Sequence, residues 1–404
     1  MIPKHQVGGA NHFRECLFLA PMIAAVKQQF TDLFQKAPML YRSPGRINII
    51  GEHTDYNQGF VLPAAIEQAA YIAIGPREDN ALHLYAVSMQ ELVVVQLTGL
   101  SPQPGAWSNY IAGVAEQFIR MGFPIKGFNM VLYSDVPIGA GLSSSAAIEC
   151  AVAFALNECF HCGLDRLQLV HLAQKAEHEF AGVQCGIMDQ FASMMGRRNH
   201  LIKLDCRSLA YEYIPFQLRS YAMILFDTNV KHSLAATAYN ERRQQCEQGV
   251  QWIADQMPHV QTLRDADIDM LEKFVFPKNP LIYKRCAYVV KEIQRVEAAC
   301  RALEAGDLNA LGQLMYQTHT GLSQDYEVSC RELDLLVSLA KNSPGVIGAR
   351  MMGGGFGGCT LNLVEAARLD ELINTVQISY ERDTNLPLNY YLVSAADGSG
   401  RVDH

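Results

Sequence analysis

The chain has 404 residues, with 33 lysines and arginines against 41 aspartates and glutamates, which gives a net charge of −8. This length predicts two or three domains, each able to bury its own core. An acidic chain without a run of four basic residues is not typical of a nucleic-acid-binding protein. Neither a signal peptide nor an uncharged stretch of roughly 18 to 20 apolar residues is present, and the 11 cysteines follow no disulfide spacing. We therefore expect a cytoplasmic protein without a membrane or nucleic-acid partner.

Apolar periodicity predicts the following elements in chain order. Helix is expected over residues 20–35, several short strands over 39–74, single strands over 81–85, 92–97 and 128–133, helices over 146–159 and 167–180, strands over 200–204 and 222–226, mostly amphipathic helix over 234–339, and mixed strand and helix over 346–393. Because strands and helices come in blocks, the fold class is α+β. The pattern changes near residues 195–215, which predicts an N-terminal domain over 1–205 and a C-terminal domain over 206–404.

A loop of small residues stands between the strand predicted at 128–133 and the helix predicted at 146–159. It consists of Gly139, Ala140, Gly141, Leu142, Ser143, Ser144 and Ser145. Small residues let backbone N–H groups approach an anion, and a helix N-terminus adds about half a positive charge. A capped helix after a glycine turn is the alternative. Three successive serines favour a phosphate cradle, but the loop matches neither Walker A nor the protein-kinase glycine loop.

A dense group of polar residues follows the apolar run at 47–50. Its members are Glu52, His53, Asp55, Tyr56 and Asn57. Alternating donors and acceptors at the end of a strand suit a ligand rich in hydroxyl groups, and Arg46 adds a fixed positive charge. A solvated polar turn is the alternative. A metal site is disfavoured, because the spacing matches no familiar metal motif.

Residues 353–358 contain five glycines in six positions. They formally match the dinucleotide-binding pattern G-x-G-x-x-G, but a strand, not a helix, is expected at 361–364, so we reject that interpretation. Such glycine density indicates a loop whose backbone must approach another group closely, for example the triphosphate side of a nucleotide site. Ordinary turn chemistry is the alternative.

These motifs, in this order, resemble those of the GHMP family of small-molecule kinases. PGRINIIGEHTDYNQGFVLP at 44–63 is similar to the signature of the members that phosphorylate galactose, while DVPIGAGLSSSAA and MMGGGFGGC match the second and third motifs. AEHEFAG, CGIMDQF and HSLAATAYNERRQQCE also match, so the resemblance spans roughly residues 40–360. It implies a two-domain α+β fold with the active site in the inter-domain cleft. The implied activity is ATP-dependent phosphorylation of galactose at its anomeric hydroxyl, a step in galactose catabolism.

The resemblance also implies a role for each matching residue. Asp189 would be the catalytic base, and Arg46 would lie beside the reacting hydroxyl. The residues that bind the sugar would be Glu52, His53, Thr54, Asp55, Gly186, Asp189 and Tyr239.

The loop from Gly139 to Ser145 would wrap the phosphates of ATP. Ser145 and Glu177 would bind Mg²⁺, with Ser144 as the alternative serine ligand. Phosphoryl transfer requires such positioning, charge neutralisation and an acceptor for one proton. We expect galactose and ATP as the small-molecule partners and a monomeric protein.

Two other functions stay open at this point. One is a related kinase that acts on N-acetylgalactosamine or galacturonate, against which Thr54 and Asn57 argue modestly. The other is a sensor that binds galactose and ATP and signals through a protein partner. The intact Ser145-Ala146-Ala147 sequence, together with Asp189 and Arg46, argues against the sensor.

Overall fold

The computed structural model describes residues 11–230 and 235–402. The first residues of the segment HSLAATAYNERRQQCE, at 232–234, lie outside the described residues, as does the expected start of helix at residue 234. No helix in the described ranges is long and apolar enough to cross a membrane.

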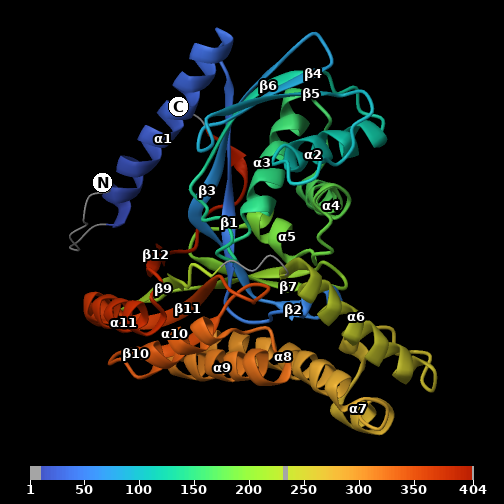
Figure 1. The fold of residues 1–404 in the computed structure, drawn as a ribbon, viewed down its shortest axis with the longest axis vertical. Helices are drawn as coiled ribbons and strands as arrows, with labels where there is room; N and C mark the ends of the chain where they lie inside the picture. Colours follow the sequence, from blue (N-terminus) through green and yellow to red (C-terminus); the bar gives the residue numbers. More distant parts are fainter. Residues whose placement is uncertain (1–10, 231–234, 403–404) are drawn as a thin grey trace.

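A six-stranded sheet forms the upper half of the molecule in Figure 1. Its order is β13 (Gly400–Arg401), β1 (Met39–Asn48), β3 (Pro63–Pro76), β6 (Phe128–Ser134), β4 (Ala81–Ala86) and β5 (Glu91–Gln96). Only the β4–β6 pairing is parallel within this sheet. The long strand β3 is almost entirely buried because both faces of the sheet are covered.

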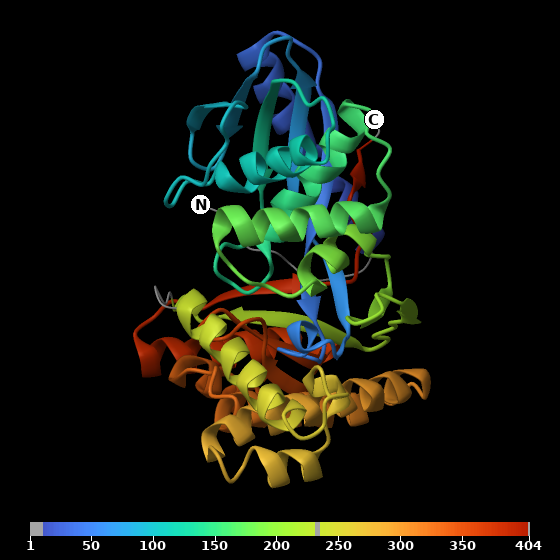
Figure 2. The ribbon, with the colours of Figure 1, turned by 90° about the vertical axis from the view of Figure 1, so that its right-hand side faces the viewer.

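Helices cover the two faces of this sheet unequally (Figures 1 and 2). On one face lies α1 (Asn11–Phe34), which packs Ile23, Val26 and Phe30 against β1, β3 and β6. The other face carries four helices: α2 (Asn109–Arg120), α3 (Ser144–Cys159), α4 (Arg166–Ala176) and α5 (Met188–Met195). Helix α4 begins with a capping box from Asp165 and continues as a single π-helical turn, η2 (Glu177–Ala181).

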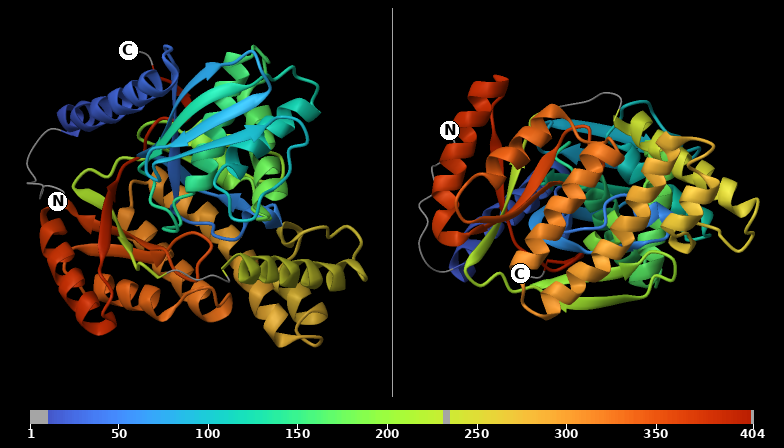
Figure 3. Two further views of the ribbon diagram at one scale, coloured as in Figure 1. Left: turned by 45° about the horizontal axis from the view of Figure 1, so that its top comes forward. Right: turned by 90° about the horizontal axis from the view of Figure 1, so that it is seen from below.

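The lower half contains a four-stranded antiparallel sheet and most of the later helices. The strand order is β10 (Val346–Met351), β11 (Cys359–Glu365), β9 (Tyr221–Asp227) and β12 (Asn389–Val393). The helices are α6 (Ala235–Ala254), α7 (Ile268–Phe274), α8 (Pro280–Glu304), α9 (Leu308–Thr320), α10 (Arg331–Lys341) and α11 (Leu369–Thr384). Helices α8 and α9 run side by side below this sheet, away from the upper half (Figures 1 and 3).

A small three-stranded sheet links the two halves. It is formed by β2 (Phe60–Val61), β7 (His200–Asp205) and β8 (Tyr211–Pro215). One continuous apolar core also extends across both halves, from Ile47 and Ile50 to Leu225 and Leu361. The turn between β1 and β2 therefore lies on the lower half of the molecule (Figure 1).

The α+β class and most of the expected elements are confirmed. The leading helix begins at Asn11, earlier than expected, and continues through Pro21. Helices α2 and α5 and strand β8 were not predicted. Strand β13 follows the expected division at residue 205 in the chain but belongs to the upper sheet, because Arg401 pairs with Tyr41 of β1. We propose that division as one between the bulk of the two halves, because β7 and β8 pair across it and the turn between β1 and β2 lies on the lower half.

Candidate active site

A cavity of about 320 Å³ lies where three segments meet. They are the serine loop (residues 139–145), the turn after β1 and the glycine-rich loop (residues 353–358). This size is within the range of small-molecule sites. The structure brings these predicted site residues to its wall: Arg46, Glu52, His53, Asp55, Gly139, Gly141, Leu142, Ser143, Ser144, Ser145, Glu177, Gly186, Asp189 and Tyr239. Two predicted residues do not line it, Thr54 and Ala140, and both are buried.

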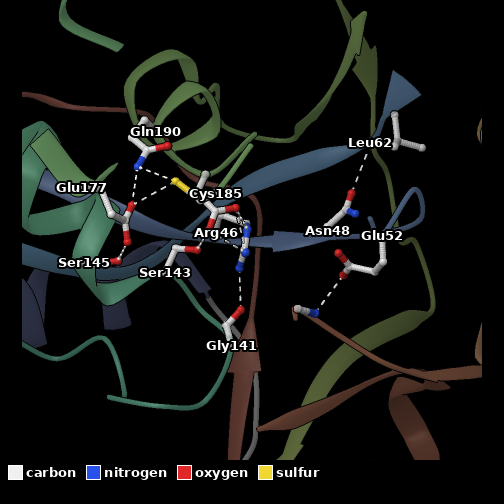
Figure 4. Close-up of polar contacts among 12 residues, drawn as sticks. Arg46, Asn48, Glu52, Leu62, Gly141, Ser143, Ser145, Glu177, Cys185 and Gln190 are labelled. Carbon is white, nitrogen blue, oxygen red and sulfur yellow. Dashed lines mark hydrogen bonds and ion pairs between the residues drawn. The ribbon is translucent and has the colours of Figure 1, made fainter. Parts of the chain in front are cut away.

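Arg46 and Asp189 form a bidentate ion pair at the centre of the site (Figure 4 shows the arginine). Nε and Nη2 of Arg46 each donate to a carboxylate oxygen at 2.9 Å, and Nη1 donates to the carbonyl of Gly141. The Ser143 hydroxyl also donates to Asp189. Burial opposes the positive charge of Arg46, but the carboxylates of Asp189 and Glu52 outweigh it and raise the arginine's pKa. Asp189 is thus fixed by charge and geometry and is still 23% exposed.

Glu52 connects the turn after β1 to the lower sheet through hydrogen bonds. Its Oε1 accepts from Nη2 of Arg350 at 2.5 Å and from the backbone N–H of Gly353 at 2.9 Å. Arg350 is completely buried and also donates to the carbonyl of Asn48 at 2.8 Å. This ion pair therefore connects β1 with β10 beneath the cavity.

Asp55 lies directly against Gly186. A Cβ atom on Gly186 would be 1.8 Å from Oδ2 of Asp55, so no larger residue fits there without moving the carboxylate. Burial, and then the charge of Asp189, raises the pKa of Asp55 to about 7.

Thr54 is placed differently from the expectation. Its hydroxyl lies within hydrogen-bond distance of the carbonyls of Gly51 and Phe60, at 2.8 and 2.6 Å, and its side chain is fully buried. The structure gives this residue a part in the turn and no contact with the cavity, because a buried hydroxyl must find a partner within the protein.

His53 and Tyr239 form the aromatic part of the wall. Their ring centroids are 5.4 Å apart, and His53 has a backbone φ of 64°, a left-handed conformation that is uncommon for histidine. Burial, together with the charge of Arg242, lowers the pKa of His53 to about 3. The imidazole is therefore neutral at physiological pH and offers one donor and one acceptor.

A second polar group joins the N-terminus of α3 to η2 and α5. Ser145, not Ser144, donates to Glu177 Oε1, at 2.8 Å, while Gln190 donates to Glu177, as Figure 4 shows, and also to the fully buried Glu149. Burial raises the pKa of Glu177, and Oε1 of Glu149 has no hydrogen-bond partner. No cluster of three His, Cys, Asp or Glu side chains in the described part of the chain could hold a metal ion by itself.

The glycine-rich loop packs against the serine loop. A Cβ on Gly353 would be 3.2 Å from Cα of Gly141, and one on Gly355 would be 2.2 Å from the carbonyl oxygen of Val328. Both glycines have positive φ angles. The predicted close approach is thus made to protein backbone, which positions Gly141 beside Arg46.

Several lining residues were not singled out from the sequence. They include Val183, Cys185, Met188 and Phe356. Cys185 belongs to the quoted motif CGIMDQF, as does Gln190, so the motif itself was the available signal. Arg350 directly precedes MMGGGFGG, but its pairing with Glu52 spans 298 positions and has no local signature.

Comparison with known proteins identifies the family. Three family models match: the GHMP kinases N terminal domain over 109–197, the galactokinase galactose-binding signature over 28–76, and the GHMP kinases C terminal domain over 299–382. A galactokinase from Roseiflexus sp. is 39% identical over 364 residues, which are 90% of this chain and 93% of that protein. One from Fusobacterium nucleatum is 37% identical over 94% of this chain and all of its own length.

Solved structures give the same result. Lactococcus lactis galactokinase complexed with galactose matches with a TM-score of 0.90 and 34% identity, covering 94% of this chain and all of that one. Methanococcus jannaschii mevalonate kinase shares the fold, with a TM-score of 0.64 and 16% identity over 90% of this chain and all of that one. The chain therefore belongs to the galactokinase family of GHMP kinases.

Proposed function

We propose that this chain transfers the γ-phosphoryl group of ATP to the anomeric hydroxyl of galactose and releases α-D-galactose 1-phosphate and ADP. One observation carries the proposal: the Asp189 carboxylate faces the cavity, held by Arg46 and Ser143, between the serine loop and the Glu52–Asp55 turn. The galactokinase relatives, and the galactose complex of one of them, support galactose as the acceptor. Membership of a kinase family makes ATP the phosphoryl donor.

Asp189 acts as the general base. It accepts the proton of the anomeric hydroxyl while that oxygen bonds to the γ-phosphorus and the bond to the β–γ bridging oxygen breaks. Arg46 stabilises the negative charge that develops on the transferred group, and its bidentate contact keeps the carboxylate oriented. Without substrate, the Ser143 hydroxyl donates a hydrogen bond to one carboxylate oxygen of Asp189. In the proposed complex, the anomeric hydroxyl of the sugar donates to that oxygen in its place.

The donor set around Ser145 and Glu177 fits Mg²⁺, which prefers oxygen ligands and takes few of them from protein in phosphate sites. Buried carboxylates, with one unpartnered oxygen on Glu149, favour a nearby cation. When bound, Mg²⁺ neutralises charge on the phosphates. The N–H groups of residues 139–145 then bind the phosphates, and the side chains of Glu52, His53, Asp55 and Tyr239 bind the sugar hydroxyls. We propose a cytoplasmic monomer.

A coupled ADP-release assay with ATP and Mg²⁺ tests the reaction. The acceptors are galactose, N-acetylgalactosamine, galacturonate, glucose and mevalonate, and phosphorus NMR identifies each product. We expect turnover with galactose and an anomeric phosphate. If only another acceptor is phosphorylated, that compound and not galactose is the substrate. If galactose and ATP bind by calorimetry but no acceptor turns over, the chain is a sensor.

The metal ligand is tested with Ser145→Ala and Ser144→Ala in parallel. Because Ser145 is the serine that contacts Glu177, its loss should raise the Mg²⁺ concentration needed for half-maximal turnover several-fold. Ser144→Ala is the matched control. If only Ser144→Ala raises the Mg²⁺ concentration needed for half-maximal turnover, Ser144 is the metal ligand and Ser145 is not.

A further inference from the structure

A chain of polar groups leads from the cavity wall into the helices of the lower half. Nδ1 of His53 lies 2.8 Å from the hydroxyl of Tyr56, which lies 2.8 Å from the hydroxyl of Tyr326, which lies 3.2 Å from Sγ of Cys246. We call these four residues the His53 relay. Tyr56 is in the turn after β1, Tyr326 follows α9 and its π-helical extension, and Cys246 is in α6. His53 alone among the four lines the cavity.

The inner end of the relay is firmly held. Tyr326 and Cys246 are both completely buried. The backbone carbonyl of Tyr326 accepts a hydrogen bond from Nε of Arg242 at 2.8 Å, and its ring packs on Tyr288 with a centroid distance of 4.8 Å. The hydroxyl of Tyr326 is therefore a fixed point against which Tyr56 is oriented.

The outer end of the relay is unsatisfied. Nε2 of His53 is buried and has no hydrogen-bond partner, although the residue borders the cavity. A buried polar atom without a partner costs free energy unless a ligand satisfies it. Because the imidazole is neutral, Nε2 is a donor or an acceptor according to what Nδ1 does.

The relay favours one of these two tautomers. A phenol is a good donor and an imidazole nitrogen a good acceptor, so we assign the Tyr56 hydroxyl as donor to Nδ1. Each hydroxyl has one hydrogen; Tyr56 must then accept from Tyr326, and Tyr326 from the thiol of Cys246. This direction leaves the ring proton on Nε2.

We propose that Tyr326 and Cys246 are positioning residues that act through Tyr56 to keep the proton of His53 on Nε2, where it is donated to one hydroxyl oxygen of the sugar. This inference rests on the proposed function of the cavity. It adds two residues that cannot touch the substrate, and it states the polarity of the contact at His53.

Steady-state kinetics of Tyr326→Phe test the proposal, because this change removes one hydroxyl and keeps the ring. Loss of one buried hydrogen bond predicts a KM for galactose raised about 3- to 10-fold, with kcat changed less than about 2-fold. Cys246→Ala should raise KM about 2-fold, and Cys246→Ser, which retains a donor, should restore it.

The matched control is Tyr380→Phe. Tyr380 belongs to α11, and its buried hydroxyl donates to the backbone carbonyl of Thr228 within a separate core between α11 and the lower sheet. This variant reports the general cost of losing a buried tyrosine hydroxyl, and we expect an unchanged KM. Thermal unfolding of both variants shows whether they are folded.

Two readouts distinguish positioning from packing. Nitrogen NMR of histidine-labelled protein, with His53→Gln to assign the signal, should show the Nε2–H tautomer in the wild type and a mixture in Tyr326→Phe. In a series of monodeoxygalactoses, the Tyr326→Phe penalty should disappear for the analogue that lacks the hydroxyl bound by His53.

The proposal is overturned if the wild type carries the proton on Nδ1. It is also overturned if Tyr326→Phe raises KM equally for every deoxy analogue, or no more than Tyr380→Phe does. Failure of the wild type to phosphorylate any sugar would instead refute the proposed function, and the NMR tautomer would still be read independently.

Discussion

The two sides of the cavity are built in different ways. On the side that we propose binds the sugar, called the sugar side below, Glu52, His53 and Asp55 are at most 9% exposed. On the side that we propose binds the phosphates, called the phosphate side below, Ser143 to Ser145 are partly exposed, and Ile138 at the start of the loop is 84% exposed. The sugar side suits a ligand that displaces water from a preformed polar pocket, and the phosphate side suits a ligand that arrives with its own charge.

The hydrogen bonds of the two sides differ as well. Glu52 is bonded to Arg350 and the backbone of Gly353, groups to which the proposed mechanism gives no other partner. Ser143 and Ser145 are bonded to Asp189 and Glu177, groups to which the proposed mechanism gives other partners. Substitutions on the phosphate side should therefore reduce turnover, whereas those on the sugar side should change stability and sugar affinity.

Asp189→Asn should have the largest effect and should leave sugar affinity nearly intact. Without a base, turnover should fall by about 10²- to 10⁴-fold, while galactose binding measured by calorimetry changes only a few-fold. Asp383→Asn, at an exposed ion pair with Arg382, is the control and should match the wild type. A turnover comparable to the wild type would remove Asp189 from the role of base.

Arg350→Leu probes the buried sugar side. It leaves the Glu52 carboxylate buried and unpaired, which should lower the free energy of unfolding by about 3–5 kcal/mol. Arg382→Leu, which breaks the exposed pair, should cost less than about 1 kcal/mol. Urea unfolding followed by circular dichroism measures both, and equal small losses would contradict the difference between the two regions.

Gly186→Ala tests how tightly the sugar side is shaped. The new Cβ forces the Asp55 carboxylate to move, and a displacement of about 1 Å at a binding group can cost up to about 100-fold. We expect a rise of at least about 10-fold in KM for galactose. Gly400→Ala, where a Cβ meets nothing within 4 Å, should leave KM unchanged. An unaltered KM in both variants would mean that Asp55 is free to adjust.

The pH dependence of stability should show the smallest effect. Because the pKa of Asp55 is raised to about 7, the folded state holds this proton more tightly than the unfolded state, where a usual value near 4 applies. Its contribution to stability is therefore present at pH 4 and is lost as pH rises through about 7. The midpoint of thermal unfolding of Asp55→Asn, relative to the wild type, should increase from pH 5 to pH 8. A constant difference would mean that the pKa of Asp55 in the folded protein lies below this range.

Local sequence explains the short-range parts of the site. The strand, loop and helix around Gly139 to Ser145 could be predicted because glycine and serine punctuate two apolar runs. The resemblance to a family predicted that Asp189, Glu177 and Tyr239 belong to the same site, and all three border the cavity. Their roles stay predictions.

Long-range pairing explains what could not be predicted. The Arg350–Glu52 pair and the Tyr56–Tyr326 contact join positions 298 and 270 residues apart, and no periodicity encodes them. From the sequence, the hydroxyl of Thr54 could bind a ligand, but in the structure it bonds to backbone carbonyls of its own turn. The short helix α5 contains too few residues for its periodicity to be distinct, and strand β8 is mostly exposed, so its sequence has no clear apolar face.

The pairing of Arg401 with Tyr41 has a consequence for synthesis of the protein. The sheet that starts to form first in the chain gains its outermost strand only after some 360 further residues have been made, the separation of its two partners. During translation, the outer edge of β1 is therefore open to water or to other chains. An early ribosome-bound fragment should carry an incomplete sheet, and the strand that bears Arg46 should acquire its final rigidity only when translation of β13 is finished.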